Sequence, residues 1–138
     1  MPKIKRHEAR FTTEVQKWLR HNAKDLPLAF AWEAKVATTP NLFFSQVPKH
    51  QRDALEIAKW QVFCYKISDY DQMKKPCDGV FMRDAGGMLL LHWIRKGNKT
   101  FYMIDIDRFQ AFEKSCGKKS LNEDDARKIA FKVGTLKN

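Results

Sequence analysis

The chain has 138 residues, and its 26 Lys and Arg outnumber 16 Asp and Glu to give a formal net charge of +10 at pH 7. This length predicts one domain over residues 1–138 that is large enough to bury a core. Three cysteines without a Cys-x-x-Cys pair suggest neither a disulfide framework nor a zinc knuckle, so we expect reduced thiols in a reducing compartment.

The excess positive charge lies at the two ends of the chain. Residues 1–24 hold seven Lys and Arg against two Glu, and residues 114–138 hold seven against three acids. Basic ends on a nearly neutral body favour a polyanionic partner, nucleic acid first, although such charge also serves solubility. A membrane partner is disfavoured, because neither end alternates with a broad apolar face. Since no apolar stretch has signal-peptide or membrane-spanning length, we expect a cytoplasmic protein.

Hydrophobic spacing and turn residues predict the elements of the first half of the chain. In order, they are a helix over 8–23, a strand over 28–37, a short apolar strand or loop over 42–44, a helix from 45–48 to 60, and a strand over 61–67. Pro27 ends the first helix, because the residue before a proline resists the helical conformation. Pro48 suits the first turn of the second helix.

A polar loop over 68–76 leads into the second half. The elements predicted there are strands over 78–82, 88–94 and 101–106, a short helix over 107–114, and a last helix to about 133 that opens on a capping box at Ser120–Glu123. This order of elements predicts an α/β fold, with a mixed central sheet flanked by helices.

The strand over 28–37 places a carboxylate beside a lysine. Side chains two residues apart share a strand face, so Glu33 and Lys35 lie on one face among small alanines, while Phe30 and Trp32 point to the other. A carboxylate can hold a divalent metal, and a neighbouring lysine can orient a water or a phosphate oxygen. The alternative is a solvated ion pair on an exposed strand face.

The stretch from Trp32 to Leu55 resembles the PD-(D/E)xK nuclease superfamily, and within it the homodimeric Holliday-junction resolvases of bacteria and phages. The residues that carry the resemblance are Glu33-Ala-Lys35, Phe43-Phe44, His50-Gln51 at the start of a helix, and Leu55. It implies a restriction-endonuclease-like core, a homodimer, and an endonuclease dependent on Mg²⁺ or Mn²⁺ that hydrolyses phosphodiester bonds of branched DNA. A non-catalytic nucleic-acid-binding domain on the same fold is the alternative, and an accessory protein with a protein partner is a third.

The resemblance also implies roles for single residues. Glu33 would be a metal ligand, Lys35 would position the attacking water, Glu14 would be the carboxylate of the first helix, and Gln51 would support the site. The family also has an Asp that precedes the Glu-x-Lys strand. Here only seven residues separate Asp25 from Glu33. That is too short for a strand and its return, so Asp25 reads as a helix-end residue.

Asp78 is the better candidate for the missing ligand. It follows Lys75-Pro-Cys and opens a short apolar strand, so it would complete the site if that strand lies beside 28–37. The alternative is an ordinary turn at the start of a strand. The loop acids Asp69 and Asp71 are weaker alternative ligands.

Other polar residues are expected to contact DNA or to serve the structure. The residues expected to contact the DNA backbone are Lys3, Lys5 and Arg6 in the basic start, and Lys49, His50 and Arg52 at a helix N-terminus. Residues at that helix N-terminus could instead simply face solvent. His92 reads as a structural histidine with a hydrogen-bonding partner, and Asp105 and Asp107 as residues that shape the turn into the next helix.

Overall fold

The computed structural model describes residues 3–67 and 77–137, and its centre is a mixed sheet of four strands. In spatial order the strands are β1 (Phe30–Ala37), β5 (Gly86–Trp93), β6 (Thr100–Asp105) and β8 (Lys132–Thr135). β1 runs parallel to β5, whereas β5–β6 and β6–β8 are antiparallel. The predicted α/β fold with a mixed sheet is therefore confirmed.

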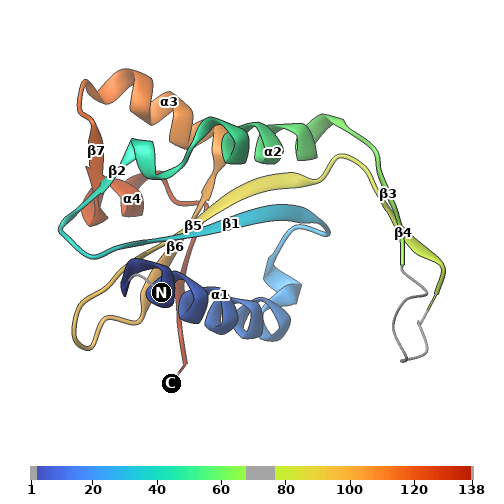
Figure 1. The fold of residues 1–138 in the computed structure, drawn as a ribbon, viewed down its shortest axis with the longest axis horizontal. Helices are drawn as coiled ribbons and strands as arrows, with labels where there is room; N and C mark the ends of the chain where they lie inside the picture. Colours follow the sequence, from blue (N-terminus) through green and yellow to red (C-terminus); the bar gives the residue numbers. More distant parts are fainter. Residues whose placement is uncertain (1–2, 68–76, 138) are drawn as a thin grey trace.

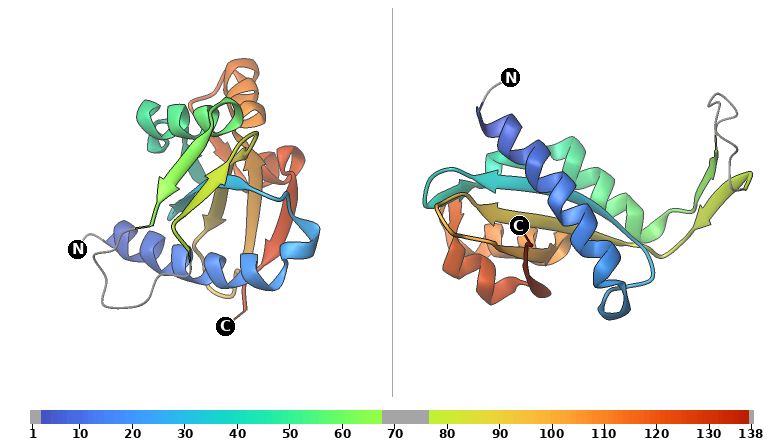
Figure 2. Two further views of the ribbon diagram at one scale, coloured as in Figure 1. Left: turned by 90° about the vertical axis from the view of Figure 1, so that its right-hand side faces the viewer. Right: turned by 90° about the horizontal axis from the view of Figure 1, so that it is seen from below.

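Helices cover both faces of this sheet (Figures 1 and 2). α1 (Lys3–His21) lies on one face, and α2 (Lys49–Trp60) and α3 (Ile106–Cys116) lie on the other. The smaller elements are η1 (Ala23–Asp25), η2 (Phe44–Gln46), α4 (Glu123–Ile129), and the strand pairs β2 (Asn41–Phe43) with β7 (Ser120–Asn122) and β3 (Phe63–Lys66) with β4 (Gly79–Met82). Among the described residues, no helix is both long and apolar enough to cross a membrane.

Two apolar clusters hold the three layers together. Under α1, Phe11 and Val15 pack with Leu90 and Phe101, and on the other face a second cluster forms around Leu55, Leu89, Tyr102 and Phe109. The inner strands β5 and β6 are thus buried on both faces, as their almost unbroken apolar runs predict.

The chain passes from β1 to its parallel neighbour β5 through α2 and the β3–β4 pair, and α2 packs closely on β5. A Cβ built on Gly87 would lie 2.1 Å from the carbonyl oxygen of Leu55 in α2, so only glycine permits this approach. β1 occupies one edge of the sheet. The Glu33–Lys35 pair therefore lies on an edge strand that is held between α1 and α2.

The first helix is longer at its start than predicted. It covers Lys3–His21 and not 8–23, because the charged residues before Phe11 include good helix formers that carry no apolar signal. Lys3, Lys5 and Arg6 therefore belong to the first two turns of α1.

The C-terminal prediction was wrong in its details. Ser120 is the first residue of β7 and does not cap a helix. The cap is Asn122, whose side chain accepts a hydrogen bond from the Asp125 amide at 2.8 Å, while the Asp125 carboxylate accepts one from the Asn122 amide at 3.1 Å. The helix ends at Ile129, and residues 132–135 form the unpredicted strand β8. A second capping box two residues later in the sequence thus takes precedence over the first.

The predicted position of the strand after Asp78 was also wrong. β4 pairs antiparallel with β3 and not with β1, whose neighbour in the sheet is β5. β3 and β4 form a two-stranded projection at one end of the molecule (Figure 1). Two short strands close in sequence pair locally at a lower cost in chain entropy than a long-range pairing with β1. The predicted loop 68–76 lies outside the described residues.

Candidate functional site

β1 brings Glu33 and Lys35 together as the alternation predicts. The Lys35 Nζ lies 3.5 Å from the Glu33 Oε1. Lys35 is nearly buried, with 9% of its surface exposed, whereas a third of the Glu33 side chain is exposed. The alternative of an exposed, solvated pair is wrong for Lys35, because its charge lies mostly out of water.

A second carboxylate approaches the same ammonium group from α1. The Glu8 Oε1 lies 4.0 Å from the Lys35 Nζ. Lys35 shares its strand face with Ala31 and Ala37, which pack on the α2 side of the sheet. Because β1 is an edge strand, the long Lys35 side chain can still reach a residue of α1, the helix on the opposite face. Carboxylates from two elements of the chain, α1 and β1, therefore approach this ammonium group.

The carboxylates of Glu8 and Glu33 are held less tightly than other carboxylates in the described part of the protein. Among the described residues, neither Glu8 nor Glu33 accepts a hydrogen bond, and their contacts with Lys35 are longer than the 2.8 Å between Arg52 and Glu113. Direct charge-assisted bonds have lengths of about 2.7–2.9 Å. The oxygens of Glu8 and Glu33 therefore keep lone pairs for water or a cation, beside a nearly buried lysine.

Gln51 adds an unsatisfied polar atom on α2. Its Oε1 is buried and has no hydrogen-bond partner in the described structure. Gln51 is one turn before Leu55 on the stripe of α2 that packs on the sheet. An unpaired buried acceptor costs about 1–3 kcal/mol, so this amide is a polar group that packing alone does not explain.

Glu14, the predicted helix carboxylate, lies elsewhere. Its carboxylate accepts a hydrogen bond from the Arg10 Nε at 3.0 Å, and it lines a cavity of about 550 Å³ together with His92. Glu8 and Glu14 are six residues apart, about 240° around a helix, so they face different directions. Glu8 takes the place expected for Glu14. The sequence indicates this role of Glu8 in one way: Glu8 is three residues before the buried Phe11 and therefore lies on the same face of the helix.

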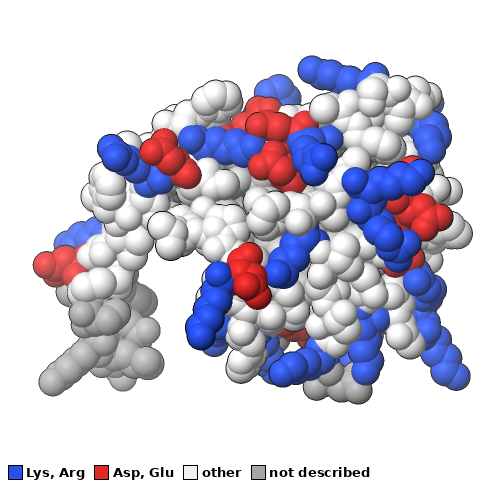
Figure 3. Space-filling model, turned by 180° about the vertical axis from the view of Figure 1, so that it is seen from behind, with Lys and Arg blue, Asp and Glu red and all other residues white. Residues whose placement is uncertain are grey.

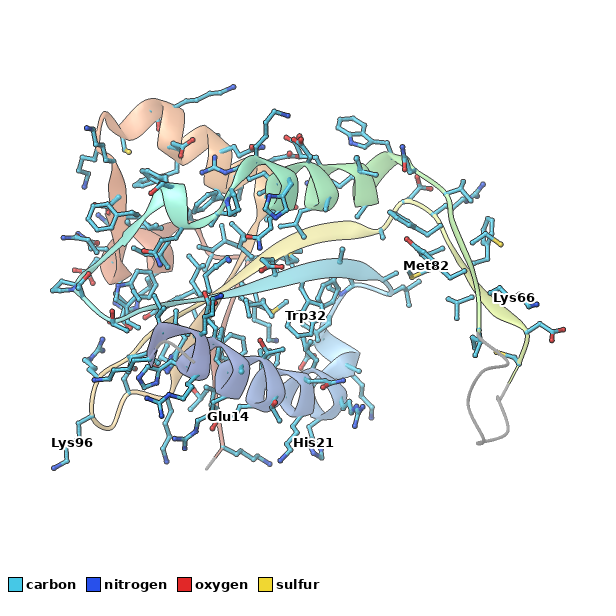
Figure 4. All side chains as sticks on the ribbon, in the orientation of Figure 1. Glu14, His21, Trp32, Lys66, Met82 and Lys96 are labelled. Carbon is cyan, nitrogen blue, oxygen red and sulfur yellow. The ribbon has the colours of Figure 1, made fainter. Side chains whose placement is uncertain are left out.

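Asp78 is not brought to Glu33 by strand pairing. The Ile67 amide donates to the Asp78 carbonyl at 2.8 Å, which places Asp78 beside Lys66 where the described strands β3 and β4 end. Figure 4 shows Lys66 far out on this projection, whereas Trp32, the neighbour of Glu33, lies in the body of the protein. The alternative reading of Asp78 as a residue of a strand-entry turn agrees with this position. Asp69 and Asp71 lie outside the described residues.

Three other acids lie where the sequence places them. Asp25 ends the 3-10 turn after α1. The Asp105 side chain caps α3 by accepting from the Asp107 amide at 2.8 Å. The Lys59 ammonium donates to the carboxylates of Asp105 and Asp107, each at 2.7 Å. Sequence reasoning missed this partner because Lys59 is 46 residues away from Asp105 in the chain.

His92 is structural, as predicted. Its Nδ1 lies 2.8 Å from the Thr100 carbonyl, and its ring stacks on Phe11 with centroids 5.2 Å apart. Burial lowers the pKa of His92 and outweighs the hydrogen bond to Thr100, so the ring is neutral at pH 7.

The predicted DNA contacts divide into exposed residues and one that is enclosed. Lys3, Lys5 and Arg6 are exposed on α1, and Lys49 and His50 are exposed at the start of α2. Lys49 pairs with Asp53 at 2.7 Å, a contact that raises the pKa of its ammonium group.

Arg52 is not free to bind DNA, so this prediction was wrong. Its guanidinium donates two hydrogen bonds to Glu113, at 2.8 and 3.0 Å. It also donates to the carbonyls of Val47 and Phe44, each at 2.7 Å, and lies over the Phe109 ring. Only 15% of the side chain is exposed, so Arg52 joins α2, α3 and the segment before α2.

Among the described residues, no third acidic or imidazole ligand joins Glu8 and Glu33. In residues 3–67 and 77–137, no three His, Cys, Asp or Glu side chains gather as a protein metal site of three ligands would require. Comparison with family models, with curated proteins and with solved structures finds no match to this chain.

Proposed function

We propose that this protein is a divalent-metal-dependent DNA endonuclease with Glu8, Glu33 and Lys35 at its centre. The observation that carries the proposal is the nearly buried Lys35 ammonium, 3.5 and 4.0 Å from two carboxylates that accept no hydrogen bond within the described structure. A purely structural ion pair at this burial is expected to close to direct contact, as Arg52 and Glu113 do.

The residues present fit a hydrated Mg²⁺ or Mn²⁺. Mg²⁺ keeps several waters and is commonly bound by one or two carboxylates together with substrate phosphates, so Glu8 and Glu33 suffice as protein ligands. When bound, the ion would supply positive charge at the scissile phosphate and lower the pKa of a bound water. Lys35 would hold that water or a phosphate oxygen in place, and Gln51 would contribute its buried carbonyl from the α2 side.

The proposed substrate is DNA, with branched DNA the first to be tested. The net charge of +10 favours a polyanion, and the exposed lysines of α1 lie on the helix that carries Glu8. Branched DNA rests on the resemblance of residues 32–55 to junction resolvases. Two symmetric cuts in a four-way junction would require two active sites, and so a homodimer.

Cleavage by single-residue variants tests the proposal. Glu8→Gln, Glu33→Gln and Lys35→Ala should each lower Mg²⁺-dependent cleavage of four-way, flap or duplex DNA by about 100-fold or more, while binding is retained. Asp124→Asn is the matched control, because its carboxylate is exposed on α4, and it should cleave normally. Normal cleavage by Glu33→Gln or Lys35→Ala would contradict the proposal.

Glu14→Gln separates the two candidate helix carboxylates. We expect it to cleave like the wild type, because Glu14 is paired with Arg10 on another side of α1. Mn²⁺-induced line broadening in NMR gives a readout without activity. Broadening should centre on the amides around Glu8 and Glu33, and its absence there at millimolar Mn²⁺ would contradict the metal site.

A non-catalytic nucleic-acid-binding domain is the second candidate. It is favoured by the lack of a third ligand beside Glu8 and Glu33 among the described residues. In that case Lys35 would only neutralise the negative charges of Glu8 and Glu33. Salt-sensitive DNA binding without cleavage in Mg²⁺ or Mn²⁺ would select this function over the first.

A further inference from the structure

A cavity of about 550 Å³ lies apart from the proposed metal site, since Glu8, Glu33 and Lys35 do not line it. Its walls come from α1, from the hairpin that joins β5 to β6, and from residues 136–137 after β8. Sites for small molecules have volumes of about 300–1,000 Å³. The cavity is therefore large enough for a ligand of the size of a metabolite.

The most buried residues of the cavity form a floor that is apolar apart from one nitrogen atom. Phe11, Leu136 and His92 line it, with 1%, 5% and 7% of their surfaces exposed. The His92 Nδ1 lies 2.8 Å from the Thr100 carbonyl. Because a carbonyl can only accept a hydrogen bond, Nδ1 carries the proton of the neutral ring. The His92 Nε2 is then an acceptor.

This Nε2 atom opens into the cavity without a partner. In the described structure it makes no hydrogen bond, and the one buried side-chain atom there that is both unpaired and fully enclosed is the Gln51 Oε1. The His92 Nε2 must therefore reach open space, and the cavity that His92 lines is that space. It can accept a hydrogen bond from a hydroxyl or an amine of a ligand.

A second acceptor comes from α1. Glu14 lines the same cavity, and its negative charge acts on the His92 ring. The Glu14 Oε1 accepts from the Arg10 Nε at 3.0 Å, while its other oxygen accepts no hydrogen bond from any described residue. A carboxylate is a common partner of ribose hydroxyls in nucleotide sites. Together, the Glu14 and His92 acceptors suit the neighbouring hydroxyls of a sugar.

The rim of the cavity carries two lysines without an ion-pair partner in the described part of the chain, Lys99 and Lys137, whereas Arg95 is paired with Glu123. The Leu136 amide donates to the Lys99 carbonyl at 2.8 Å, so the two lysines belong to one wall. Figure 3 shows Lys and Arg gathered along the lower edge of the molecule, where the chain ends in Figure 1. A phosphate monoester carries a charge of about −1.5 to −2 at pH 7, which two lysines balance.

We propose that this cavity binds a pentose phosphate, either free or as part of a ribonucleotide. The phosphate lies at Lys99 and Lys137. The sugar hydroxyls donate to the His92 Nε2 and to the Glu14 carboxylate. Inorganic phosphate would satisfy only the rim of the cavity, and an unphosphorylated sugar only the floor. Because the cavity is separate from the proposed metal site, the proposal holds whether or not the protein cleaves DNA.

Binding of ribose 5-phosphate to the full chain tests the proposal. In calorimetric titrations without phosphate buffer, its Kd should be about tenfold or more below those of inorganic phosphate and of ribose, since each half lacks the contacts of the other. A Kd no lower than that of inorganic phosphate would overturn the proposal. AMP is the second probe. A lower Kd for AMP than for ribose 5-phosphate identifies a nucleotide as the source, and a higher one identifies a free sugar phosphate.

Two variants separate the two ends of the ligand. Glu14→Ala should raise the Kd of ribose 5-phosphate by about tenfold without weakening inorganic phosphate, because it removes only a partner of the hydroxyls. Lys99→Gln with Lys137→Gln should weaken both ligands by about tenfold or more. These side chains are outside both apolar core clusters, so thermal unfolding should remain cooperative. Unchanged binding of ribose 5-phosphate by either variant would contradict the proposal.

Lys96→Gln with Lys114→Gln is the matched control, because it removes the same two charges. Both lysines are exposed and do not line the cavity, and Figure 4 shows Lys96 pointing away from the molecule. Equal loss of ribose 5-phosphate binding in this variant would indicate general attraction of an anion and would overturn the proposal. A wild type that binds duplex DNA through Lys99 and Lys137 but does not bind ribose 5-phosphate would overturn it as well.

Discussion

Lys35 and Arg52 are two cations with little exposed surface that are held in opposite ways. Arg52 is enclosed by two carboxylate oxygens, two carbonyls and an aromatic ring at direct contact distances. Within the described residues, Lys35 has only two looser ion pairs. Full satisfaction of a buried charge indicates a structural role. Incomplete satisfaction, at a place where carboxylates converge, is the pattern expected of a site that binds something else.

Arg52→Ala should destabilise the fold by about 3–5 kcal/mol, because it leaves Glu113 and two carbonyls without their donor. Urea unfolding monitored by circular dichroism measures the loss. Lys49→Ala, three residues earlier on the same helix, is the control and should unfold like the wild type, since its ion pair with Asp53 is at the surface. Equal stability of the two variants would contradict the structural role of Arg52.

The hydroxyl of Tyr102 should lose its proton at a higher pH than an ordinary tyrosine. Burial, and then the hydrogen bond to Glu123, raise its pKa from 10.0 to about 12. A raised pKa of an acid means that its neutral form is stabilised by folding. The contribution to stability is therefore complete below pH 10 and is lost as the pH rises through about 12.

Absorbance titration near 295 nm measures this shift. One of the three tyrosines should ionise near pH 12 in the wild type, and Tyr102→Phe should remove that step. The free energy of unfolding should also fall less between pH 10 and 12 in the variant. A wild type whose tyrosines all ionise near pH 10 would show that Tyr102 is not held as described.

At the scale of elements, α1 couples the proposed DNA contacts to the site. The helix begins at Lys3 and carries Glu8 in its second turn, so deletion of residues 1–7 would disturb the site as well as the charge. Substitution keeps the helix and removes only the charge. The prediction about the basic start of the chain is therefore better tested by glutamine, which is also a good helix former.

The triple variant Lys3→Gln, Lys5→Gln, Arg6→Gln should reduce the salt dependence of DNA binding. Each lost phosphate contact lowers the slope of log affinity against log salt by about 0.9, so three contacts give a change of about 2–3. Binding titrations on duplex DNA at several salt concentrations measure it. An unchanged slope and affinity would mean that these charges serve solubility and that any DNA binding belongs to the rest of the domain.

Local patterns predicted most elements but misplaced several boundaries. The strand with Glu33, the helix from Lys49 to Trp60 and the apolar hairpin of β5 and β6 follow from periodicity and prolines alone. The start of α1 and the strand β8 do not. The first carries charged residues without an apolar period, and β8 is a short edge strand with exposed Val133, so neither has a pattern of its own.

At the scale of the whole molecule, the spacing between the layers depends on Gly87. Gly87→Ala would place a methyl group against the Leu55 carbonyl of α2, so the helix must move away from the sheet. We expect a loss of about 1–3 kcal/mol or more in the free energy of unfolding, measured by urea denaturation, as for other overpacked cores. Stability equal to the wild type would mean that α2 can shift freely on β5.

The sequence by itself determined the fold class, the pairing of Glu33 with Lys35 on one strand face, and the structural role of His92. These follow from alternation, periodicity and composition, which act over a few neighbouring residues. Only the tertiary structure decided that Glu8 rather than Glu14 approaches Lys35. It also decided that Asp78 lies beside the β3–β4 pair, away from β1, and that Arg52 is held by Glu113. Each of these depends on which face of a helix meets the sheet, or on which strand is paired with which. Such contacts join residues far apart in the chain, and no local pattern specifies them.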